Sequence, residues 1–443
     1  MKSNILEINK YTTEDIKNTI LSRYEKYKNL NSTITFLGNN INFNNKTNAL
    51  NNVPYSLKDI IITESILTTA GSKYYSNFIP KYNAELYDIL QNTGAVLIGK
   101  DSCDEFASGG SGKENFAINE NVVKNFHNSL KTTAGSSSGS CNKVASGEVV
   151  FAITTDSIDS TRIPAAYCGI VGFKPTYGSI SRHGIFQFIS SMDTVGIAAQ
   201  YVKDVEIVAK ELFKKSSKDF TSIENSISDI SKPEHVNFVI FNEFKQYIPS
   251  FLIDKLIELG HNIEYINLNK EIAEISNHIY PIIAYPEMVL NHELDTSIQV
   301  NDQNTNRNNG YSNKFKTRII LGQYIIEKIP NILEKAKKIR NLIKNYLDNI
   351  TTNKIILTPS FIKEIPNITD ATENDLVDGV IKLCNYNGGP SIVLPYYEEN
   401  KIKSLCLIGK IKSDQEVLNT ALLLEEILNF EQKNSWIRKE EVN

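Results

Sequence analysis

The sequence lacks the features that mark several common classes of protein. Its five cysteines are odd in number and form no C-x-x-C pair, so neither a disulfide framework nor a zinc site is expected, and a reducing cytoplasm fits best. No run of 18 apolar residues occurs and no apolar signal segment begins the chain, so no contact with a membrane is expected. The net charge of -4 provides no basic surface, so any nucleic acid would be held through a partner.

What is present is the composition of an ordinary globular protein, with 41% hydrophobic and 22% charged residues in a chain of 443. Apolar spacing and turn residues predict helices at residues 12–29, 85–92, 316–327 and 330–349, and strands at 57–62, 95–98, 149–153 and 236–240. The alternation predicts an α/β fold, with a mixed central sheet covered by helices on both faces. We expect a single domain over 1–443, a smaller cap-like excursion at 203–315 and a frayed tail at 432–443.

Two serines in segments rich in small and polar residues are candidate nucleophiles. Ser136 lies in the run GSSSGS that begins at Gly135, and Ser160 follows 24 residues later. A serine nucleophile needs a base, and none of the six histidines lies in a Gly/Ser-rich turn. A lysine acting through a second serine is another way to activate the hydroxyl, and Lys58 lies 78 residues before Ser136. Taken singly, each residue is more often a turn hydroxyl or a solvated lysine.

Three blocks around these residues resemble the amidase signature family. Residues 52–59 (NVPYSLKD) are similar to the family's strand-borne lysine motif, and residues 94–106 resemble the segment before its serine loop. Residues 164–178 (PAAYCGIVGFKPTYG) are a long and specific match after the second serine. The resemblance is strong over residues 50–200 and looser toward the C-terminus. It implies the amidase-signature fold and a Ser-cisSer-Lys triad made of Ser160, Ser136 and Lys58.

The resemblance also implies amide hydrolysis through an acyl-enzyme. Ser160 would attack a carboxamide carbon and release ammonia, while Ser136 would pass the proton to Lys58. Lys58 must be neutral to act as the base. Lowering its pKa from about 10.4 to about 7 costs roughly 4–5 kcal/mol, so we expect a buried lysine. The expected oxyanion hole consists of the backbone N–H groups of Ser157, Ile158, Asp159 and Ser160.

One departure from the family pattern falls inside this predicted oxyanion hole. The family usually has two glycines before the nucleophile, and Ile158 and Asp159 occupy those positions here. A β-branched residue restricts the backbone, and an acid repels the negative charge that develops on the oxygen. A scaffold subunit without activity is therefore an alternative interpretation.

The C-terminal half resembles the glutamine-hydrolysing branch of the family, whose members serve tRNA-dependent amidotransferases. Arg318, in the block TRIILG, would bind the glutamine carboxylate through its bidentate guanidinium. Tyr280 falls at the position of a substrate-binding tyrosine, and Asp378 at that of the acid that holds the substrate's ammonium. On residue type alone, each is as often an ordinary surface or core residue. A free-standing amidase for another small carboxamide is thus a second alternative.

This branch implies partner subunits and no cofactor bound by the chain itself. The chain would bind glutamine and no metal. A tRNA-binding B subunit would use ATP and Mg, and a small C subunit would complete the complex. Because the choice of acceptor belongs largely to the partner, the product would be either Gln-tRNA(Gln) made from Glu-tRNA(Gln) or Asn-tRNA(Asn) made from Asp-tRNA(Asn).

Overall fold

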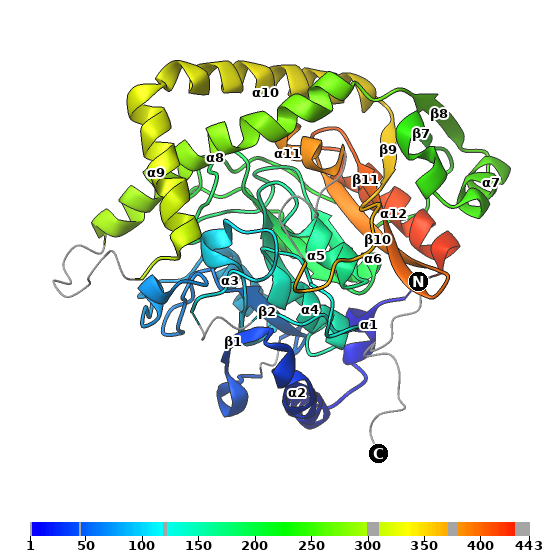
Figure 1. Cartoon of the computed structure of the whole chain (residues 1–443). Coiled ribbons are helices and arrows are strands. Elements are labelled where there is room, and N and C mark those ends of the chain that lie inside the picture. The colour runs from blue at the N-terminus through cyan, green and yellow to red at the C-terminus, as the bar shows by residue number, and fades with distance from the viewer. Residues whose placement is uncertain (1, 44–45, 118–121, 299–309, 371–379, 430–443) are drawn as a thin grey trace.

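A mixed β-sheet forms the centre of the molecule (Figure 1). The computed structural model describes all residues except 1, 44–45, 118–121, 299–309, 371–379 and 430–443. Within these described residues the sheet has 11 strands in the order β1-β3-β2-β4-β6-β5-β10-β11-β9-β7-β8. The strands are β1 (Thr33–Phe36), β2 (Pro54–Lys58), β3 (Val96–Asp101), β4 (Phe151–Asp156), β5 (Val171–Lys174), β6 (Thr194–Ala199), β7 (Asn237–Phe241), β8 (Asn262–Ile266), β9 (Ile355–Pro359), β10 (Ser391–Glu398) and β11 (Lys401–Ile408).

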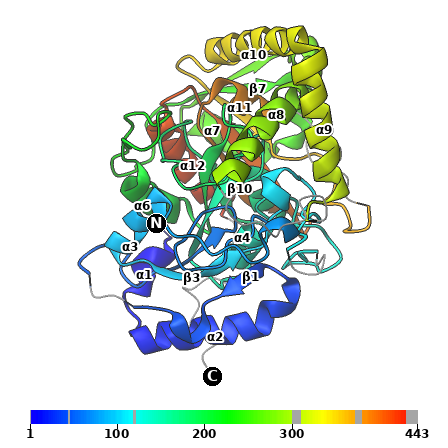
Figure 2. The same cartoon turned by 90° about the vertical axis from the view of Figure 1, so that its left-hand side faces the viewer.

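Helices cover both faces of this sheet, which confirms the predicted α/β architecture. They are α1 (Asn4–Ile8), α2 (Thr13–Tyr27), α3 (Glu85–Thr93), α4 (Ser138–Ser146), α5 (Arg162–Tyr167), α6 (Val202–Leu212), α7 (Ser250–Glu258), α8 (Lys270–Ile298), α9 (Asn313–Lys328), α10 (Pro330–Ile350), α11 (Leu383–Asn387) and α12 (Asp414–Leu428). Helices α4 and α5 pack together against β4, β5 and β10, while α6 and α12 pack together against β5, β6 and β10 (Figure 1). Helices α8, α9 and α10 form a layer at one end of the molecule, and α2 lies at the opposite end (Figures 1 and 2).

The strand that carries the predicted lysine base lies inside the sheet. Strand β2 pairs in parallel with both β3 and β4, and β4 pairs in antiparallel fashion with β6. Parallel strands end at the same edge of a sheet. Lys58, the last residue of β2, therefore lies beside the end of β4, from which the chain continues into the Ser160 segment.

Local signals account for several of the elements. Thr12 caps α2 as predicted, because its side chain and that of Asp15 form a reciprocal capping box. The helices predicted at 85–92, 316–327 and 330–349 correspond to α3, α9 and α10. The strand predicted to reach residue 62 instead ends at Lys58, where the Ile61 backbone N–H donates to the Lys58 carbonyl and closes a turn; the Asp59 carboxylate accepts from the backbone N–H and hydroxyl of Thr69.

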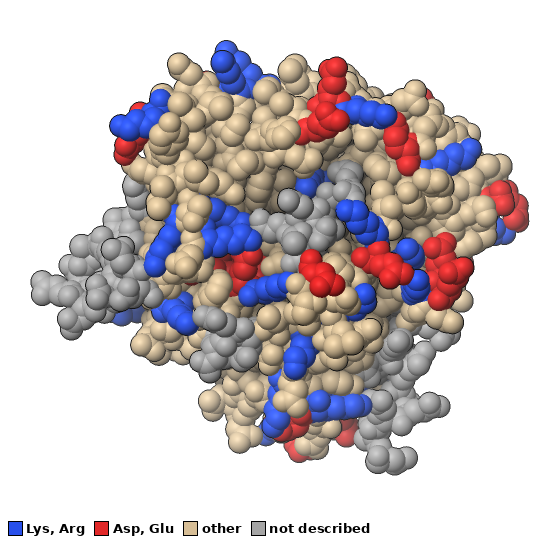
Figure 3. Space-filling model, viewed as in Figure 1, with Lys and Arg blue, Asp and Glu red and all other residues tan. Residues whose placement is uncertain are grey.

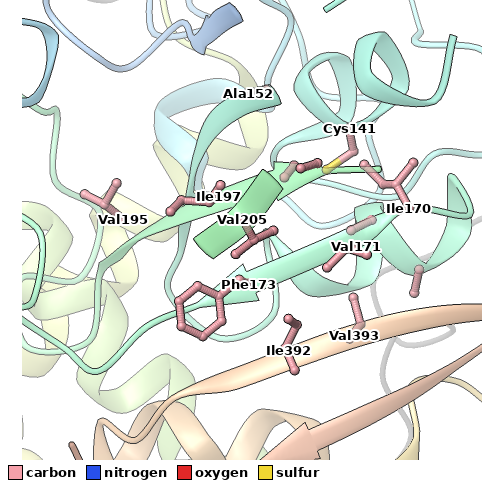
Figure 4. Close-up of a cluster of buried hydrophobic side chains, with 14 of the residues drawn as sticks. Cys141, Ala152, Ile170, Val171, Phe173, Val195, Ile197, Val205, Ile392 and Val393 are labelled. Atoms are coloured by element: carbon pink, nitrogen blue, oxygen red, sulfur yellow. The ribbon is translucent and has the colours of Figure 1, made fainter. Parts of the chain in front are cut away.

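Side chains from neighbouring strands and from α6 fill the core around the sheet. Phe173, Ile197, Val205 and Ile392, from β5, β6, α6 and β10, are buried and lie close together (Figure 4). Strands buried on both faces explain why the predicted strand segments are nearly continuous apolar runs.

The segment from 203 to 315 contributes to two parts of the molecule. Strands β7 and β8 extend the sheet at one edge, and α8 joins α9 and α10 in the helical layer. The cap-like excursion predicted for this segment stays a prediction, as does the single domain over 1–443. The tail predicted at 432–443 lies outside the described residues.

Candidate active site

Lys58 lies at the end of β2 with a completely buried side chain. Its Nζ donates to the hydroxyl oxygens of Ser136, at 2.7 Å, and Thr155, at 2.9 Å. Burial lowers the pKa of Lys58, although the charges of neighbouring carboxylates partly oppose this shift. Within the described part of the chain, no carboxylate forms an ion pair with it. The pKa of Lys58 is therefore shifted in the direction that a lysine base requires.

Ser136 precedes α4 in a tightly packed turn. The Gly135–Ser136 peptide bond is cis, and the Ser136 carbonyl accepts a hydrogen bond of 3.2 Å from the backbone N–H of Asp104. A Cβ atom at Gly135 would lie 2.0 Å from an Asp104 carboxylate oxygen, so only glycine fits there. The Gly/Ser-rich run is therefore a closely packed turn beside a buried acid, and not a flexible linker.

Ser160 lies in the turn between β4 and α5 and is 3% exposed, whereas Lys58 and Ser136 are fully buried. Its carbonyl accepts a hydrogen bond of 3.3 Å from the backbone N–H of Ser137. The structure thus brings together the three residues that the sequence separates, with the Lys58–Ser136 contact made by side chains and the link to the Ser160 turn made by backbone.

A buried ion pair holds the turn that carries Ser160. The guanidinium of Arg162 contacts both carboxylate oxygens of Asp156, at 2.9 and 3.0 Å, and donates to the Ile158 carbonyl at 2.7 Å. Burial would raise the pKa of Asp156, but the charge of Arg162 outweighs it and the pKa is lowered. Arg162 also donates to the Ile381 carbonyl and the Asn385 side chain. The turn is therefore fixed from both ends.

The predicted oxyanion segment is Ser157 to Ser160. In the part of the chain that the structure describes, the backbone N–H groups of Ser157, Ile158 and Ser160 have no protein acceptor. The carbonyls of Ile158 and Asp159 accept from Arg162 and Ile163 and are therefore directed toward α5.

The structure describes two of the three predicted substrate-binding residues. Arg318 lies on α9, is 6% exposed and donates to the carbonyl of Ser108. Its guanidinium also lies 5.9 Å from the centre of the Tyr285 ring on α8. Tyr280 lies on α8 and is half-buried. Asp378 lies outside the described residues.

Thr155 is a contact of the lysine that the sequence analysis missed. It lies near the end of β4, where its hydroxyl accepts from Lys58 and its side chain lines a cavity of about 10 Å³ together with Asp193 and Arg182. A larger hollow of about 560 Å³, near Tyr201 and Glu425, contains none of the predicted site residues. The candidate site therefore lies beside the small cavity, where the predicted residues are, and not at the larger hollow. Polar residues at the end of an otherwise apolar strand were the available signal for Thr155.

Surface charge, metal-ligand clusters and membrane-spanning helices would be signs of a second kind of site. On the face shown in Figure 3, Lys and Arg are interspersed with Asp and Glu. Among the described residues, no cluster of three His, Cys, Asp or Glu side chains could hold a metal ion. No helix described by the structure combines the length and hydropathy needed to cross a membrane.

Comparisons with known proteins show the family to which the chain belongs. The family described as Amidase matches residues 35–418. The chain is 31% identical to the A subunit of glutamyl-tRNA(Gln) amidotransferase from Mycoplasma genitalium, over 97% of this chain and 99% of that protein. It is 32% identical to the protein of the same name from Pelagibacter ubique, over 97% of this chain and 96% of that one.

Solved structures show the same fold. The crystal structure of the A subunit of glutamyl-tRNA(Gln) amidotransferase from Thermotoga maritima superposes with a TM-score of 0.78 at 25% identity, covering 95% of this chain and 94% of that one. The 6-aminohexanoate cyclic dimer hydrolase superposes with a TM-score of 0.81 at 16% identity, covering 97% of each chain. The second likeness concerns the fold alone.

Proposed function

Because this chain belongs to the amidase family, we propose that it is the glutamine-hydrolysing subunit of a Glu-tRNA(Gln) amidotransferase. The observation that carries the proposal is the completely buried Lys58, whose amine lies 2.7 Å from the hydroxyl of Ser136 beside the Ser160 turn. Relatives with that name match nearly the whole chain, which favours this substrate over other carboxamides.

In the proposed mechanism, Ser160 is the nucleophile and Ser136 relays its proton. The Ser160 oxygen bonds to the carboxamide carbon of glutamine while its proton passes through Ser136 to Lys58. When the tetrahedral intermediate collapses, the C–N bond breaks and the leaving nitrogen takes the proton from Lys58 as ammonia. Water then attacks the γ-glutamyl ester by the same relay, the C–O bond breaks, and glutamate leaves with Ser160 restored.

The backbone of the 157–160 segment would stabilise the negative oxygen in both steps. The N–H groups of Ser157, Ile158 and Ser160, together with that of Asp159, are proposed as the donors. This role needs backbone groups only, so the side chains of Ile158 and Asp159 do not by themselves prevent activity. The carbonyls of Ile158 and Asp159 already accept hydrogen bonds from α5, which supports amides of the segment that face the other way.

Arg318 is proposed to bind the α-carboxylate of glutamine, with Tyr280 contacting the substrate and Asp378 holding the ammonium. A buried guanidinium on a rigid helix suits bidentate binding of a carboxylate. Removing the guanidinium in Arg318→Ala should lower kcat/KM for glutamine by the equivalent of about 2–5 kcal/mol. A simple carboxamide without an α-carboxylate should lose much less. Equal losses on both substrates would contradict the clamp and favour a free-standing amidase.

The ammonia is proposed to pass to partner subunits in the cytoplasm. A B subunit would bind the tRNA and use ATP and Mg to activate the acceptor, and a small C subunit would complete the complex. The chain itself would need no cofactor, since serine and lysine suffice for the hydrolysis.

The decisive experiment measures glutamine hydrolysis and co-purifies partners. The wild-type chain, with its partners, should release glutamate and ammonia, and Ser160→Ala should lose at least about 10³-fold of that rate. Ser404→Ala is a matched control, since Ser404 is a buried serine whose hydroxyl contacts that of Ser360 in the sheet and not the site. A folded wild-type complex without glutaminase activity would establish the scaffold alternative. Full activity without any ATP-using, tRNA-binding partner would establish the free-standing amidase.

A further inference from the structure

The buried carboxylate of Asp193, which is not part of the proposed oxyanion segment, binds the first residue of that segment. One of its oxygens accepts the hydroxyl of Ser157 at 2.6 Å, and the other accepts the backbone N–H groups of Phe188, at 2.7 Å, and Ile189, at 2.9 Å. Both Asp193 and Ser157 are buried. A charge-assisted hydrogen bond of this length between buried groups fixes the direction of the serine side chain and hence of its backbone.

The contact extends the pairing of two strands beyond their last backbone pair. Strands β4 and β6 end their ladder at the pair Asp156 and Thr194, and the next residues on each strand are Ser157 and Asp193. Backbone pairing therefore stops where the oxyanion segment begins, and the side-chain contact takes its place. This leaves the N–H groups of the segment available while the segment itself stays tied to the sheet.

The loop that ends in Asp193 is held in turn by the helical layer. Glu287 of α8 accepts the backbone N–H of Ser191 at 2.9 Å. Arg340 of α10 donates to the carbonyl and to the hydroxyl of Ser191, at 2.7 Å in each case. A continuous set of polar contacts thus runs from α8 and α10 through residues 188–193 to Ser157.

We propose that Asp193 is a positioning residue, which fixes the oxyanion segment through the hydroxyl of Ser157 and is itself set by α8 and α10. The proposal rests on the proposed function, because it assigns the segment its role in stabilising the transition state. Donors to an oxyanion must be preorganised, and small displacements weaken them where the negative charge develops. The contact should therefore matter for the transition state and little for the bound substrate or product.

The chain provides a close control for this arrangement. Asp204, at the start of α6, is a buried carboxylate that also accepts one serine hydroxyl, from Ser3 at 2.5 Å, and two backbone N–H groups, from Asn4 and Ile5 at 3.0 Å. It has the same chemistry as Asp193 and contacts none of the site residues. Ser3→Ala removes an equivalent hydroxyl-to-carboxylate bond, together with the bond by which Ser3 caps α1, at a place where only stability can respond.

The test compares binding of a transition-state mimic with binding of the product. The open-chain γ-semialdehyde of glutamate, whose concentration is corrected for the cyclic imine that it forms with its own amine, reacts at its aldehyde carbon with the Ser160 oxygen. The serine proton passes to Lys58 and the aldehyde oxygen becomes the oxyanion of a tetrahedral adduct, whereas glutamate binds without a covalent bond. In Ser157→Ala, which leaves the charge of Asp193 in place, kcat for glutamine and the affinity for the semialdehyde should both fall about 10- to 100-fold. KM and the affinity for glutamate should change by less than about threefold. Ser157→Thr, which keeps a hydroxyl, should restore most of the loss.

The remaining variants separate positioning from simple stability. Arg340→Met should also lower kcat and the affinity for the semialdehyde, by less than Ser157→Ala does, and leave KM and the affinity for glutamate nearly unchanged. Ser3→Ala should match wild type in kcat and in both affinities. Equal binding of the semialdehyde by wild type and Ser157→Ala would overturn the proposal, and so would equal weakening of semialdehyde and glutamate. If wild type itself neither hydrolyses glutamine nor binds the semialdehyde, the proposed function fails, a result distinct from failure of the positioning role.

Discussion

Buried lysines occur in two settings within the same part of the sheet. Lys100 on β3 and Lys143 on α4 each lie near a buried carboxylate, that of Asp59 at 3.6 Å and that of Asp101 at 3.1 Å. Lys58 on β2 is equally buried, yet among the described residues no carboxylate lies at ion-pair distance from its amine, which contacts only two hydroxyls. The amine of Lys100 also contacts a hydroxyl, that of Thr68 at 2.7 Å, but in addition to the carboxylate of Asp59. All three amines are removed from water, so the difference lies in what surrounds the charge and not in burial.

The comparison shows how one fold can hold lysines as structural cations and as a base. An ion-pair partner favours the protonated lysine, whereas hydroxyls can accept from it or donate to it and so allow both forms. Burial raises the pKa of Asp59 to about 6 and lowers that of Lys100, and the mutual attraction of the two groups opposes both shifts. Lys58 has no such carboxylate at close range, and burial lowers its pKa, so its surroundings are those that a lysine base requires.

The largest expected effect comes from removing Lys58. Lys58→Met keeps an apolar side chain of similar length in the pocket but has no group to take the proton from Ser136. Glutamine hydrolysis should fall by at least about 10³-fold, because groups of a triad act as a unit. The midpoint of urea unfolding should stay near that of wild type or rise. Rapid hydrolysis by this variant would remove the distinction between the two kinds of lysine.

Removing a paired lysine should damage stability and not chemistry. Lys143→Met leaves the carboxylate of Asp101 buried without its ion pair, which typically costs about 3–5 kcal/mol of the free energy of unfolding. Urea unfolding measures this loss, and kcat per folded molecule should remain within about threefold of wild type. Adding Asp101→Asn should recover part of the stability by removing the stranded charge. A stable but inactive Lys143→Met would place this lysine in the mechanism.

A smaller effect is expected from one of the hydroxyls beside Lys58. Thr155→Val keeps the shape of the side chain and removes one acceptor of the lysine amine. The rate of glutamine hydrolysis should fall about tenfold, the equivalent of about 1.4 kcal/mol for a hydrogen bond to a group that becomes charged. Thr358→Val, at a buried threonine of β9, is the control and should leave the rate unchanged. Identical rates for the two variants would show that Thr155 plays no part.

The pH dependence of the wild-type rate, which needs no substitution, should show a change of up to about tenfold per pH unit. Because burial lowers the pKa of Lys58 from its usual 10.5, the neutral base is present above that lowered pKa and is lost as the pH falls through it. The contribution of Lys58 to stability also increases with pH. Between the lowered pKa and 10.5 the unfolded chain binds the additional proton, so the free energy of unfolding contributed by Lys58 rises with pH. A rate that stays constant from about pH 5 to about pH 9 would contradict a lysine base.

Much of the fold could be predicted because its signals are local. The capping box at Thr12 and the apolar runs of the strands depend on residues only a few positions apart. The order of the strands could not be predicted in this way. Strand β10, for example, lies between β5 and β11, and its pairing with β5 joins segments more than 200 residues apart in the sequence.

The site, too, has residues that local sequence could predict and residues whose contacts depend on distant segments. Lys58 and Ser136 could be proposed as partners because each lies in a distinctive block of sequence, and in the structure their side chains are hydrogen-bonded. Thr155 was missed because its contact with Lys58 depends on the register of two strands 97 residues apart. The bond between Ser157 and Asp193 likewise depends on where the β4–β6 ladder ends, which no single segment specifies.

The contacts of Arg162 also have a consequence for the order in which the polypeptide is made. Its guanidinium donates to Ile381 and Asn385, which follow it by 219 and 223 residues. The lysine and both serines therefore leave the ribosome long before the groups that close the Ser160 turn have been synthesised. A nascent chain that stops before residue 380 contains all three proposed catalytic residues but not two of the acceptors through which Arg162 holds the Ser160 turn. Release of ammonia should therefore begin only when translation of the chain is almost complete.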